Sequence, residues 1–377
     1  MIQIDSNFPS GNIEVVAADD PANIRLRIRP DPVTNFLQWF HFRVVGAKDR
    51  DLVLRIENAN DALVRKGWEG YRAFASLDSQ AWFRVPSAYD GQVFAISHRP
   101  DRDSIYYAYF PPYTSEDLRR LVGRCQMDPR CRAEILGRTI DGEAIDLLTI
   151  GERSAGRKAI WAIGRQHPGE VQASWWMEGF LDALLDRRNV AANTLLSKAT
   201  VYVVPNMNPD GTRRGQHRTN AGGVNLNQQW EAPSPEKGPE VFHVLERMTK
   251  TSLDFCLDVH ADEELPFVFF ARVDLNGPIP PQAAALRHGF GEALAKLSPD
   301  CKPDGSYVRP HSRIGPMAFC GPQIAQRFGA PAVTLEIPYK EVAELPDPVE
   351  GYSTRHCREL GRACVEALAA VFAGAGK

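Results

Sequence analysis

The sequence has no long hydrophobic run and no strong excess of charge. Its start has neither a basic leader nor the apolar stretch of a secretory signal, and no segment approaches the ~20 apolar residues of a membrane helix. The formal net charge is −3 over 377 residues, so electrostatics gives no reason to expect a nucleic acid or an anionic membrane as a partner. We therefore expect a globular protein without a membrane span.

Cysteines are few, and their number is odd. Seven cysteines in a long chain without an evident signal favour reduced thiols in a cytoplasm over a disulfide framework. Cys125 and Cys131 are close in sequence, but no neighbouring histidine completes a tetrahedral metal site, so we interpret them as structural thiols. Internal repeats, low-complexity tracts and a glycine-rich phosphate loop are also missing. The expected location is cytoplasmic.

The composition is that of a globular protein large enough for two domains. Hydrophobic residues make up 44% and charged residues 24% of the chain, close to average usage. Near Pro111 and Pro112 the residue pattern changes, and Thr114 is a predicted N-cap of a helix that runs through Leu121. We therefore predict two domains, residues 1–112 and residues 113–377.

Short alternating segments separated by Gly, Pro, Asn and Asp dominate the first 110 residues. This pattern is typical of an all-β antiparallel sandwich. The expected strands cover residues 24–28, 39–45, 52–56, 71–75, 92–96 and 105–110.

Apolar strands alternate with helices in the second predicted domain. This order predicts an α/β domain with a mixed, mostly parallel sheet covered by helices on both faces. In such domains ligands bind beyond the carboxyl ends of the strands. The expected strands cover residues 159–163, 201–204, 255–259 and 332–337, and the expected helices cover residues 170–185, 239–248, 281–297 and 354–372.

Potential metal ligands follow two of these strands. His167 and Glu170 are separated by a Pro-Gly turn, a spacing that lets an imidazole nitrogen and a carboxylate oxygen reach one ion, and His260 ends another strand. Separately, the histidines would be loop or rim residues and Glu170 a carboxylate favoured by a helix dipole. Together, two histidines and one glutamate are a common ligand set of catalytic zinc, which keeps a fourth position for water. The sequence therefore predicts one zinc ion.

Other polar residues could serve the same site. Asp258 lies two residues before His260 and could orient its imidazole or form a plain structural hydrogen bond. Residues 205–230 form a long irregular segment of the kind that often serves a site. Arg218 in that segment could stabilise negative charge, although a single arginine is more often a solvated surface group. Glu336 interrupts an apolar strand, and because an unpaired buried carboxylate is costly it must pair, protonate or face a polar cleft.

Four motifs, taken in order, resemble the zinc metallocarboxypeptidase family, in particular its cytosolic carboxypeptidase-like branch with an N-terminal β domain. They are His167-Pro168-Gly169-Glu170, the segment from Pro205-Asn206-Met207-Asn208-Pro209-Asp210-Gly211 to Asn227, Asp258-Val259-His260, and Thr334-Leu335-Glu336. The resemblance implies that His167, Glu170 and His260 bind zinc. It also implies that Glu336 is the general base and later proton donor in hydrolysis of C-terminal peptide bonds, with a peptide or protein tail as the substrate.

The same resemblance suggests substrate-binding residues. Arg218 would polarise the scissile carbonyl, and Asn227 would help to hold the terminal carboxylate of the substrate. Arg313 is the nearest candidate for a basic residue that recognises an acidic, glutamate-type side chain. Tyr307 or Tyr339 could supply a substrate-capping phenol, or either could be an ordinary packed or surface tyrosine.

Gln228 is a departure from the family pattern, which usually has arginine directly after the asparagine. A neutral amide cannot supply the charge-assisted grip of a guanidinium, unless Arg165, Arg213 or Arg214 compensates. Two other hypotheses therefore stay open: a deacylase of small N-acyl amino acids, and a non-catalytic binding protein built on the peptidase fold. By analogy with the branch, we expect the N-terminal domain to serve assembly or substrate gating; the oligomeric state stays open.

Overall fold

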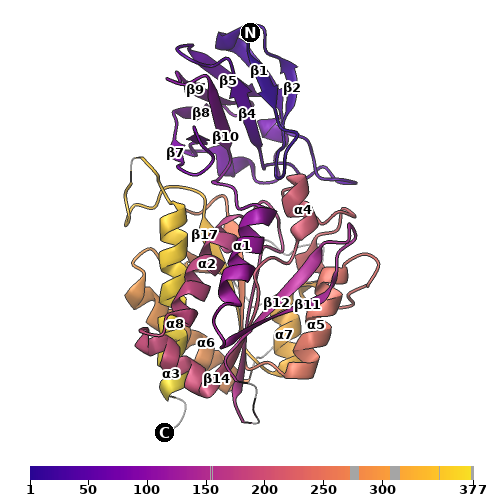
Figure 1. Ribbon diagram of the computed structural model, residues 1–377, viewed down its shortest axis with the longest axis vertical. Helices are drawn as coiled ribbons and strands as arrows, with labels where there is room; N and C mark the ends of the chain where they lie inside the picture. Colours follow the sequence, from indigo (N-terminus) through magenta and orange to yellow (C-terminus); the bar gives the residue numbers. More distant parts are fainter. Residues whose placement is uncertain (153, 155, 272–279, 306–314, 348, 375–377) are drawn as a thin grey trace.

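Two lobes, one all-β and one α/β, are stacked along the long axis of the molecule (Figure 1). The computed structural model describes residues 1–152, 154, 156–271, 280–305, 315–347 and 349–374. We call the part from the first strand to β10 the N-terminal lobe and the part from α1 onward the C-terminal lobe. The change from one to the other falls between residues 108 and 115, around the boundary predicted at 112/113.

The N-terminal lobe contains two five-stranded sheets within the described residues. In spatial order the first consists of β1 (Gln3–Asp5), β4 (His41–Val45), β10 (Ser104–Ala108), β6 (Phe74–Ser76) and β7 (Phe83–Arg84). The second consists of β2 (Glu14–Ala17), β3 (Ile24–Arg27), β5 (Leu52–Ile56), β9 (Phe94–His98) and β8 (Ser87–Tyr89). Short 3-10 helices connect some of them: η1 (Pro21–Asn23), η2 (Ala59–Asp61) and η3 (Arg65–Trp68). The predicted antiparallel arrangement is confirmed, with the exception that β3 and β5 run parallel.

Alternating side chains make the core of this lobe. On β5, Leu52, Leu54 and Ile56 are buried while the two residues between them are partly exposed, the period of two expected of a strand with one face on a core. Aromatic rings fill the space between the sheets, where the Phe94 ring lies 4.8 Å from that of Trp68. Such packing of two inner faces is that of a β-sandwich.

A seven-stranded mixed sheet forms the centre of the C-terminal lobe within the described residues. Its spatial order is β11 (Cys131–Arg138), β12 (Ala144–Ile150), β14 (Ala199–Val204), β13 (Lys158–Gly164), β15 (Phe255–Asp262), β17 (Ala332–Pro338) and β16 (Phe269–Phe270). The four strands from β14 to β17 are mutually parallel, whereas the strands at both edges pair in antiparallel fashion. The carboxyl ends of three central strands, β13, β15 and β17, therefore meet at one edge of the sheet.

Helices cover both faces of this sheet (Figure 1). They are α1 (Ser115–Cys125), α2 (Gln172–Leu185), α3 (Val190–Lys198), α4 (Pro209–Arg214), α5 (Pro239–Thr251), α6 (Pro281–Leu297), α7 (Cys320–Phe328) and α8 (Thr354–Gly374), with the 3-10 helices η4 (Leu226–Gln228) and η5 (Pro316–Ala318). The predicted cap of α1 is present, because the Thr114 hydroxyl accepts from the Asp117 amide and the Asp117 carboxylate accepts from the Thr114 amide.

The strand β13 shows why helices are needed on both sides. Ile160 and Ala162 belong to the core shared with α2, α3, α6 and α8, whereas Trp161 and Ile163 belong to the core shared with α5 and α7. Because neighbouring side chains on a strand point to opposite faces, an entirely apolar strand must be covered twice. The predicted fold class is thereby confirmed.

Polar and aromatic contacts join the two lobes. The Tyr109 and Tyr339 rings are 4.7 Å apart, and the Asn12 side-chain amide donates to the Gly215 carbonyl at 3.0 Å. Gly215 has a φ of +70°, and a Cβ atom there would lie 2.7 Å from the carbonyl oxygen of Gly11. Glycine is therefore required where the N-terminal lobe approaches the end of α4.

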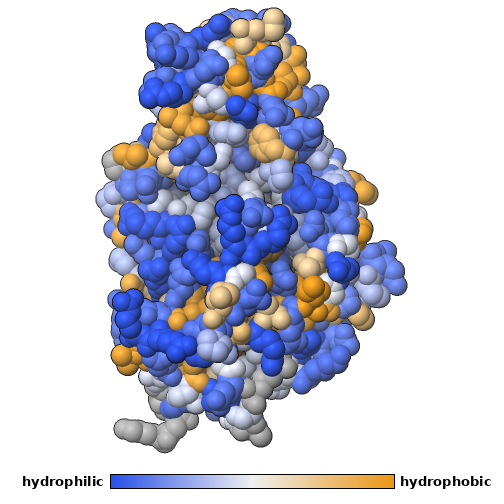
Figure 2. All heavy atoms as spheres, in the orientation of Figure 1, coloured by the Kyte–Doolittle hydropathy of each residue, from blue (hydrophilic) through white to orange (hydrophobic). Residues whose placement is uncertain are grey.

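Polar residues dominate the face of the molecule seen in Figure 2. Among the described residues, no helix has the length and apolarity needed to cross a membrane. All seven cysteines are buried, and each is a free thiol.

Candidate active site

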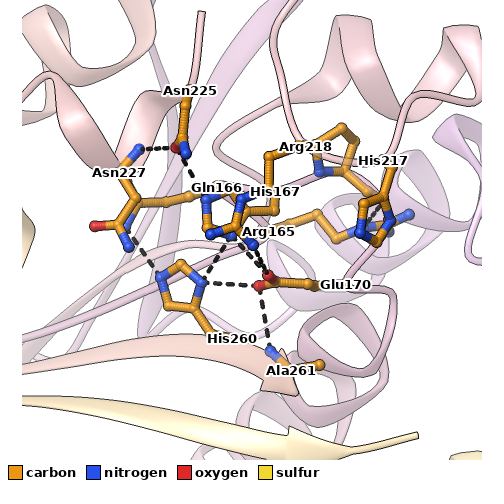
Figure 3. Close-up of polar contacts among 12 residues, drawn as sticks. Arg165, Gln166, His167, Glu170, His217, Arg218, Asn225, Asn227, His260 and Ala261 are labelled. Atoms are coloured by element: carbon orange, nitrogen blue, oxygen red, sulfur yellow. Dashed lines mark hydrogen bonds and ion pairs between the residues drawn. The ribbon is translucent and has the colours of Figure 1, made fainter. Parts of the chain in front are cut away.

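The structure brings together the three predicted metal ligands at the carboxyl ends of β13 and β15. The ligand atoms of His167, Glu170 and His260 all lie within 4.8 Å of one another, and all three residues are buried. His167 and Glu170 lie on the turn that follows β13, and His260 lies near the end of β15 (Figure 3). His260, which is 93 residues from His167 and 90 from Glu170 in sequence, thus meets them because β13 and β15 are parallel neighbours.

Glu170 lies between the two imidazoles. Its Oε1 atom is 2.7 Å from His167 Nδ1, its Oε2 atom is 2.8 Å from His260 Nδ1, and the two Nδ1 atoms are 3.1 Å apart. Two nitrogens and a carboxylate that converge in this way are a donor set of catalytic zinc. The residues present therefore fit a zinc ion.

The other side of the His167 ring is fixed by an asparagine. His167 Nε2 lies 3.0 Å from Asn225 Oδ1, and the same oxygen accepts a hydrogen bond from the Asn227 amide at 3.1 Å. Because an amide oxygen can only accept, the imidazole proton belongs on Nε2 and the Nδ1 lone pair faces the metal position. Sequence reasoning missed Asn225, although it stands two residues before the predicted Asn227.

The His260 ring is oriented from behind in a similar way. His260 Nε2 lies 3.1 Å from Asp258 Oδ1, which also accepts from Gln166 Nε2 at 2.8 Å. The Trp230 indole donates to Gln166 Oε1 at 2.9 Å and so fixes the orientation of that amide. Of the two roles that the sequence left open for Asp258, the geometry favours the orienting one.

Burial and charge act together on the titration of the three ligands. Burial lowers the pKa of the His167 imidazole to about 4, so this ring is neutral at pH 7. Burial alone would raise the pKa of Glu170, but the neighbouring His167 and His260 hold it well below its usual range. Burial also opposes the charged form of His260, yet the Asp258 and Glu170 carboxylates raise its pKa. The Glu170 carboxylate is therefore ionised and favours a cation.

Arg165 shapes the turn that carries two of the ligands. Its buried guanidinium donates to the Pro168 carbonyl at 2.7 Å and to the Ser174 hydroxyl at 2.8 Å, and burial lowers its pKa to about 10. Its backbone has a φ of +63°, a conformation that non-glycine residues rarely adopt. The Arg165 guanidinium is thus engaged in hydrogen bonds that hold the turn. It does not replace the arginine that the family usually has at the position of Gln228.

Two further predicted residues lie beside the ligands. Arg218 Nη1 is 3.4 Å from Glu170 Oε1, and its side chain is 21% exposed (Figure 3). Glu336 on β17 is the register partner of His260 on β15, so both side chains project from the same face of the sheet. Glu336 is partly exposed between Leu335 and Ile337, which are buried. A guanidinium therefore lies beside Glu170, and a carboxylate lies on the strand next to His260, on the same face of the sheet.

The residues predicted to hold the substrate lie on η4, next to the Asn225 contact. Asn227 Oδ1 accepts from the Cys320 amide at 3.4 Å, and Gln228 follows it. Arg213 and Arg214 both pair with Asp141, at 2.9 and 2.6 Å. These two arginines are consequently engaged elsewhere and, like Arg165, do not compensate for Gln228.

The remaining predicted residues fall into two groups. Arg313 and Tyr307 lie outside the described residues. Tyr339 is buried, and its hydroxyl donates to the Gly169 carbonyl at 2.7 Å. Of the two roles that the sequence left open for Tyr339, the structure shows the packed tyrosine.

Comparisons with known proteins agree with this architecture. Residues 4–110 match the family model of the cytosolic carboxypeptidase N-terminal domain, and residues 124–298 match that of zinc carboxypeptidases. The two matches lie on either side of the boundary predicted at 112/113, which stays a prediction. The chain is also 40% identical to an uncharacterized protein of Zymomonas mobilis, over 98% of this chain and 96% of that protein.

Named relatives point to the same class of enzyme. The chain is 29% identical to cytosolic carboxypeptidase 2 of Xenopus tropicalis, over 79% of this chain but only 34% of that protein. The chain thus spans about a third of this much longer relative. A metallo-carboxypeptidase from Burkholderia cenocepacia has 38% identity and a TM-score of 0.95, and the match covers 98% of this chain and 99% of that one.

A further solved structure is similar over nearly its whole length. The metallo-carboxypeptidase from Pseudomonas aeruginosa, in complex with (2-guanidinoethylmercapto)succinic acid, has 37% identity and a TM-score of 0.92, with 98% of each chain covered. The chain therefore belongs to the zinc carboxypeptidase family. It is a metallocarboxypeptidase, a hydrolase of peptide bonds whose cofactor is zinc.

The orienting role of Asp258 can be tested by metal affinity. In Asp258→Asn the carboxylate that holds His260 becomes a neutral amide, and we expect zinc to bind roughly 10–100 times more weakly, the usual cost of losing such a partner. Competition with a chromophoric chelator measures this affinity. Asp254→Asn, a change on the solvent side of the same segment, is the control. Equal zinc affinity in Asp258→Asn and the parent protein would contradict the role.

Proposed function

We propose that the chain removes C-terminal residues from peptides, with His167, Glu170 and His260 as the zinc ligands and Glu336 as the general base. The observation that carries the proposal is the meeting of the three ligand atoms within 4.8 Å, with Glu336 in register beside His260. These residues come from two different strand ends and one neighbouring strand. Packing of an apolar core alone does not require buried histidines and carboxylates at this edge of the sheet.

The chemistry follows from the charges that surround the scissile carbonyl. When bound, zinc supplies a positive charge that lowers the pKa of water toward about 7. Glu336 accepts a proton from the attacking water and later donates a proton to the leaving amine. The Arg218 guanidinium stabilises the negative charge that develops on the carbonyl oxygen.

The predicted binding site for the substrate's terminal carboxylate departs from the family pattern, because Gln228 stands where the family usually has arginine. Asn227 offers a neutral amide, Gln228 offers another, and the guanidinium groups of Arg165, Arg213 and Arg214 are engaged elsewhere. The Pseudomonas aeruginosa relative was solved with a succinic acid derivative, which bears carboxylates. A preference for acidic, glutamate-type C-termini, mediated by Arg313, stays a prediction from the sequence.

The departure at position 228 keeps a second candidate function open, hydrolysis of small N-acyl amino acids. A deacylase uses the same ligands and the same general base, but the acyl group of its substrate is small rather than a peptide. Gln228 is the observation behind this candidate. The hypothesis of a non-catalytic binding protein has no comparable support, because all three ligands and Glu336 are present.

A cytoplasmic location is also part of the proposal. It is supported by the names of the cytosolic carboxypeptidase relatives and by seven cysteines that are all free thiols.

A trimming assay with metal removal tests the function directly. We expect the protein to release single residues from the C-termini of a peptide library, to lose this activity on dialysis against a chelator and to recover it with zinc.

In Glu336→Gln, the loss of the proton acceptor should lower kcat by about 10²–10⁴ while zinc content stays unchanged. Glu359→Gln on α8, an exposed carboxylate, serves as the control. Full activity of Glu336→Gln would refute its assignment as the base.

The role of Arg218 predicts a loss of turnover without loss of metal. Removing one donor to the developing oxyanion costs roughly 10²–10³ in kcat, so Arg218→Ala should fall by that factor and still bind zinc. Arg214→Ala is a matched control on the same segment, because that side chain is paired with Asp141. Near-normal turnover of Arg218→Ala, measured with a chromogenic peptide, would exclude the role.

The two candidate functions differ in what lies on the acyl side of the cleaved bond. We expect a free-acid peptide to be cleaved faster than both its C-terminal amide and an N-acyl amino acid; faster cleavage of the N-acyl amino acid than of the free-acid peptide would favour the deacylase. In Gln228→Arg the restored charge should lower KM for the free-acid peptide about 10-fold or more, the value of a charge-assisted hydrogen bond. Gln229→Arg, one residue away, should not. An unchanged KM in Gln228→Arg would show that position 228 does not face the terminal carboxylate.

A further inference from the structure

The backbone of the segment that carries Arg218 is bound by a residue of the N-terminal lobe. The Asp31 carboxylate accepts hydrogen bonds from the amides of His217 and Arg218 at 2.7 Å each and from the amide of Thr219 at 2.8 Å. It also accepts from the Thr219 hydroxyl at 3.1 Å. Asp31 is only 3% exposed. The Asp31 carboxylate thus accepts hydrogen bonds from three consecutive residues, and the middle one is Arg218.

The opposite side of the same segment contacts the turn with the metal ligands. The Gly169 amide, between His167 and Glu170, donates to the His217 carbonyl at 2.9 Å. A Cβ atom at Gly169 would lie 2.3 Å from His217 Nδ1, so only glycine permits this approach. His217 Nε2 in turn lies 3.1 Å from Glu263 Oε1 in a buried pair. Residues 217–219 are therefore fixed between Asp31 and the turn that binds the metal.

Three convergent amides form a concavity that prefers an anion. The Asp31 carboxylate fills this concavity and so fixes the backbone conformation of residues 217–219. It thereby also fixes the position and direction of the Cα–Cβ bond of Arg218. An arginine side chain has many rotamers, which makes its starting geometry important for reaching one target. Here the target is the space beside Glu170 Oε1, 3.4 Å from Arg218 Nη1.

We propose that Asp31 is a positioning residue of the hydrolytic reaction, which acts through the backbone of Arg218. The N-terminal lobe then supplies part of the catalytic geometry, beyond the assembly or gating role expected from the sequence. The inference rests on the role of Arg218 given under the proposed function.

Two other contacts between the lobes do not involve Arg218. Lys66 Nζ pairs with Glu264 at 3.2 Å on the exposed rim, and the Asn12 amide reaches the Gly215 carbonyl, three residues before Arg218. Asp31 differs from them because one of its hydrogen bonds is made with the Arg218 amide itself. Its own loop is fixed by a bond from the Asp31 amide to the Phe36 carbonyl at 2.7 Å.

Asp31→Asn is the first test. An asparagine has one side-chain oxygen, and its NH2 group would face amides that also donate, so the concavity is no longer filled. We expect kcat on a cleavable peptide to fall about 10–100-fold, the cost of a small misplacement of a catalytic group, while zinc content stays unchanged. Lys66→Ala, which removes an exposed contact between the lobes, should retain the parent kcat. An unchanged kcat in Asp31→Asn would overturn the proposal.

A double-mutant cycle separates positioning from general support of the fold. If Asp31 acts through Arg218, Asp31→Asn should lower kcat further by less than about threefold when Arg218 is already alanine. The same fold-loss in both backgrounds would show that Asp31 supports the fold rather than the arginine. If Asp31→Asn does not fold, Thr219→Val, which removes the hydroxyl that donates to Asp31 and accepts from Gln216, is taken through the same cycle and is judged by the same criterion.

Hydrogen exchange gives a readout that does not depend on peptidase activity. In Asp31→Asn the amides of residues 217–219 should exchange faster than in the parent, while those of β13 and β15 keep their protection. Unchanged exchange at residues 217–219 would overturn the proposal. If the parent protein itself cleaves no peptide, the proposed function fails, and the exchange data still decide whether Asp31 fixes this segment.

Discussion

The Glu170 carboxylate, buried between two imidazole rings, is the contact on which the rest of the site depends. A buried carboxylate is costly unless it is paired and hydrogen-bonded, and here each oxygen faces one Nδ1 atom at 2.7 or 2.8 Å. The surrounding groups serve to keep this arrangement in place. Arg165 holds the turn, Asn225 and Asp258 orient the two rings, and the Ala261 amide donates to Glu170 Oε2 at 3.2 Å.

The two lobes contribute differently to this centre. Parallel strands of the C-terminal lobe bring these residues to one edge of the sheet: His260 and Glu336 lie on β15 and β17, and the other two ligands lie on the turn after β13. The N-terminal lobe contacts the long segment between β14 and α5, whose helices α4 and η4 are short. A segment of this kind gains its order from its neighbours. Contacts with the N-terminal lobe order this segment without any change in the central sheet.

The catalytic and the substrate-binding parts of the site are separable. The metal ligands, Glu336 and Arg218 are placed by strand ends and by buried polar contacts, whereas Gln228 lies on the partly exposed η4. A substitution there changes the charge offered to a substrate without disturbing the metal position. In the proposed function, the family chemistry is retained while a neutral amide at position 228 replaces the guanidinium that the family usually has there.

The sequence by itself determined the elements with strong local signals. Continuous apolar runs identified the central strands, because strands covered on both faces leave no polar positions, and Thr114 identified the start of α1 through its cap. The hairpin of β11 and β12 was missed because β11 lies at the sheet edge, is only partly buried and contains a bulge. The helices α3 and α7 were missed because they are short, and α7 has Gly321 and Pro322 in its first turn.

For the site, the sequence determined the chemical types, and the tertiary structure decided the partners. A histidine or glutamate at the exit of an apolar strand stands out locally, so the three ligands could be predicted, whereas the role of Glu336 stays a prediction. Asn225, Gln166 and Asp31 could not, because their roles depend on contacts across the fold; Asp31 is 186 to 188 residues away from the amides that it binds. A side chain's spacing in sequence carries no information about such distant neighbours, whereas strand order and lobe packing fix them.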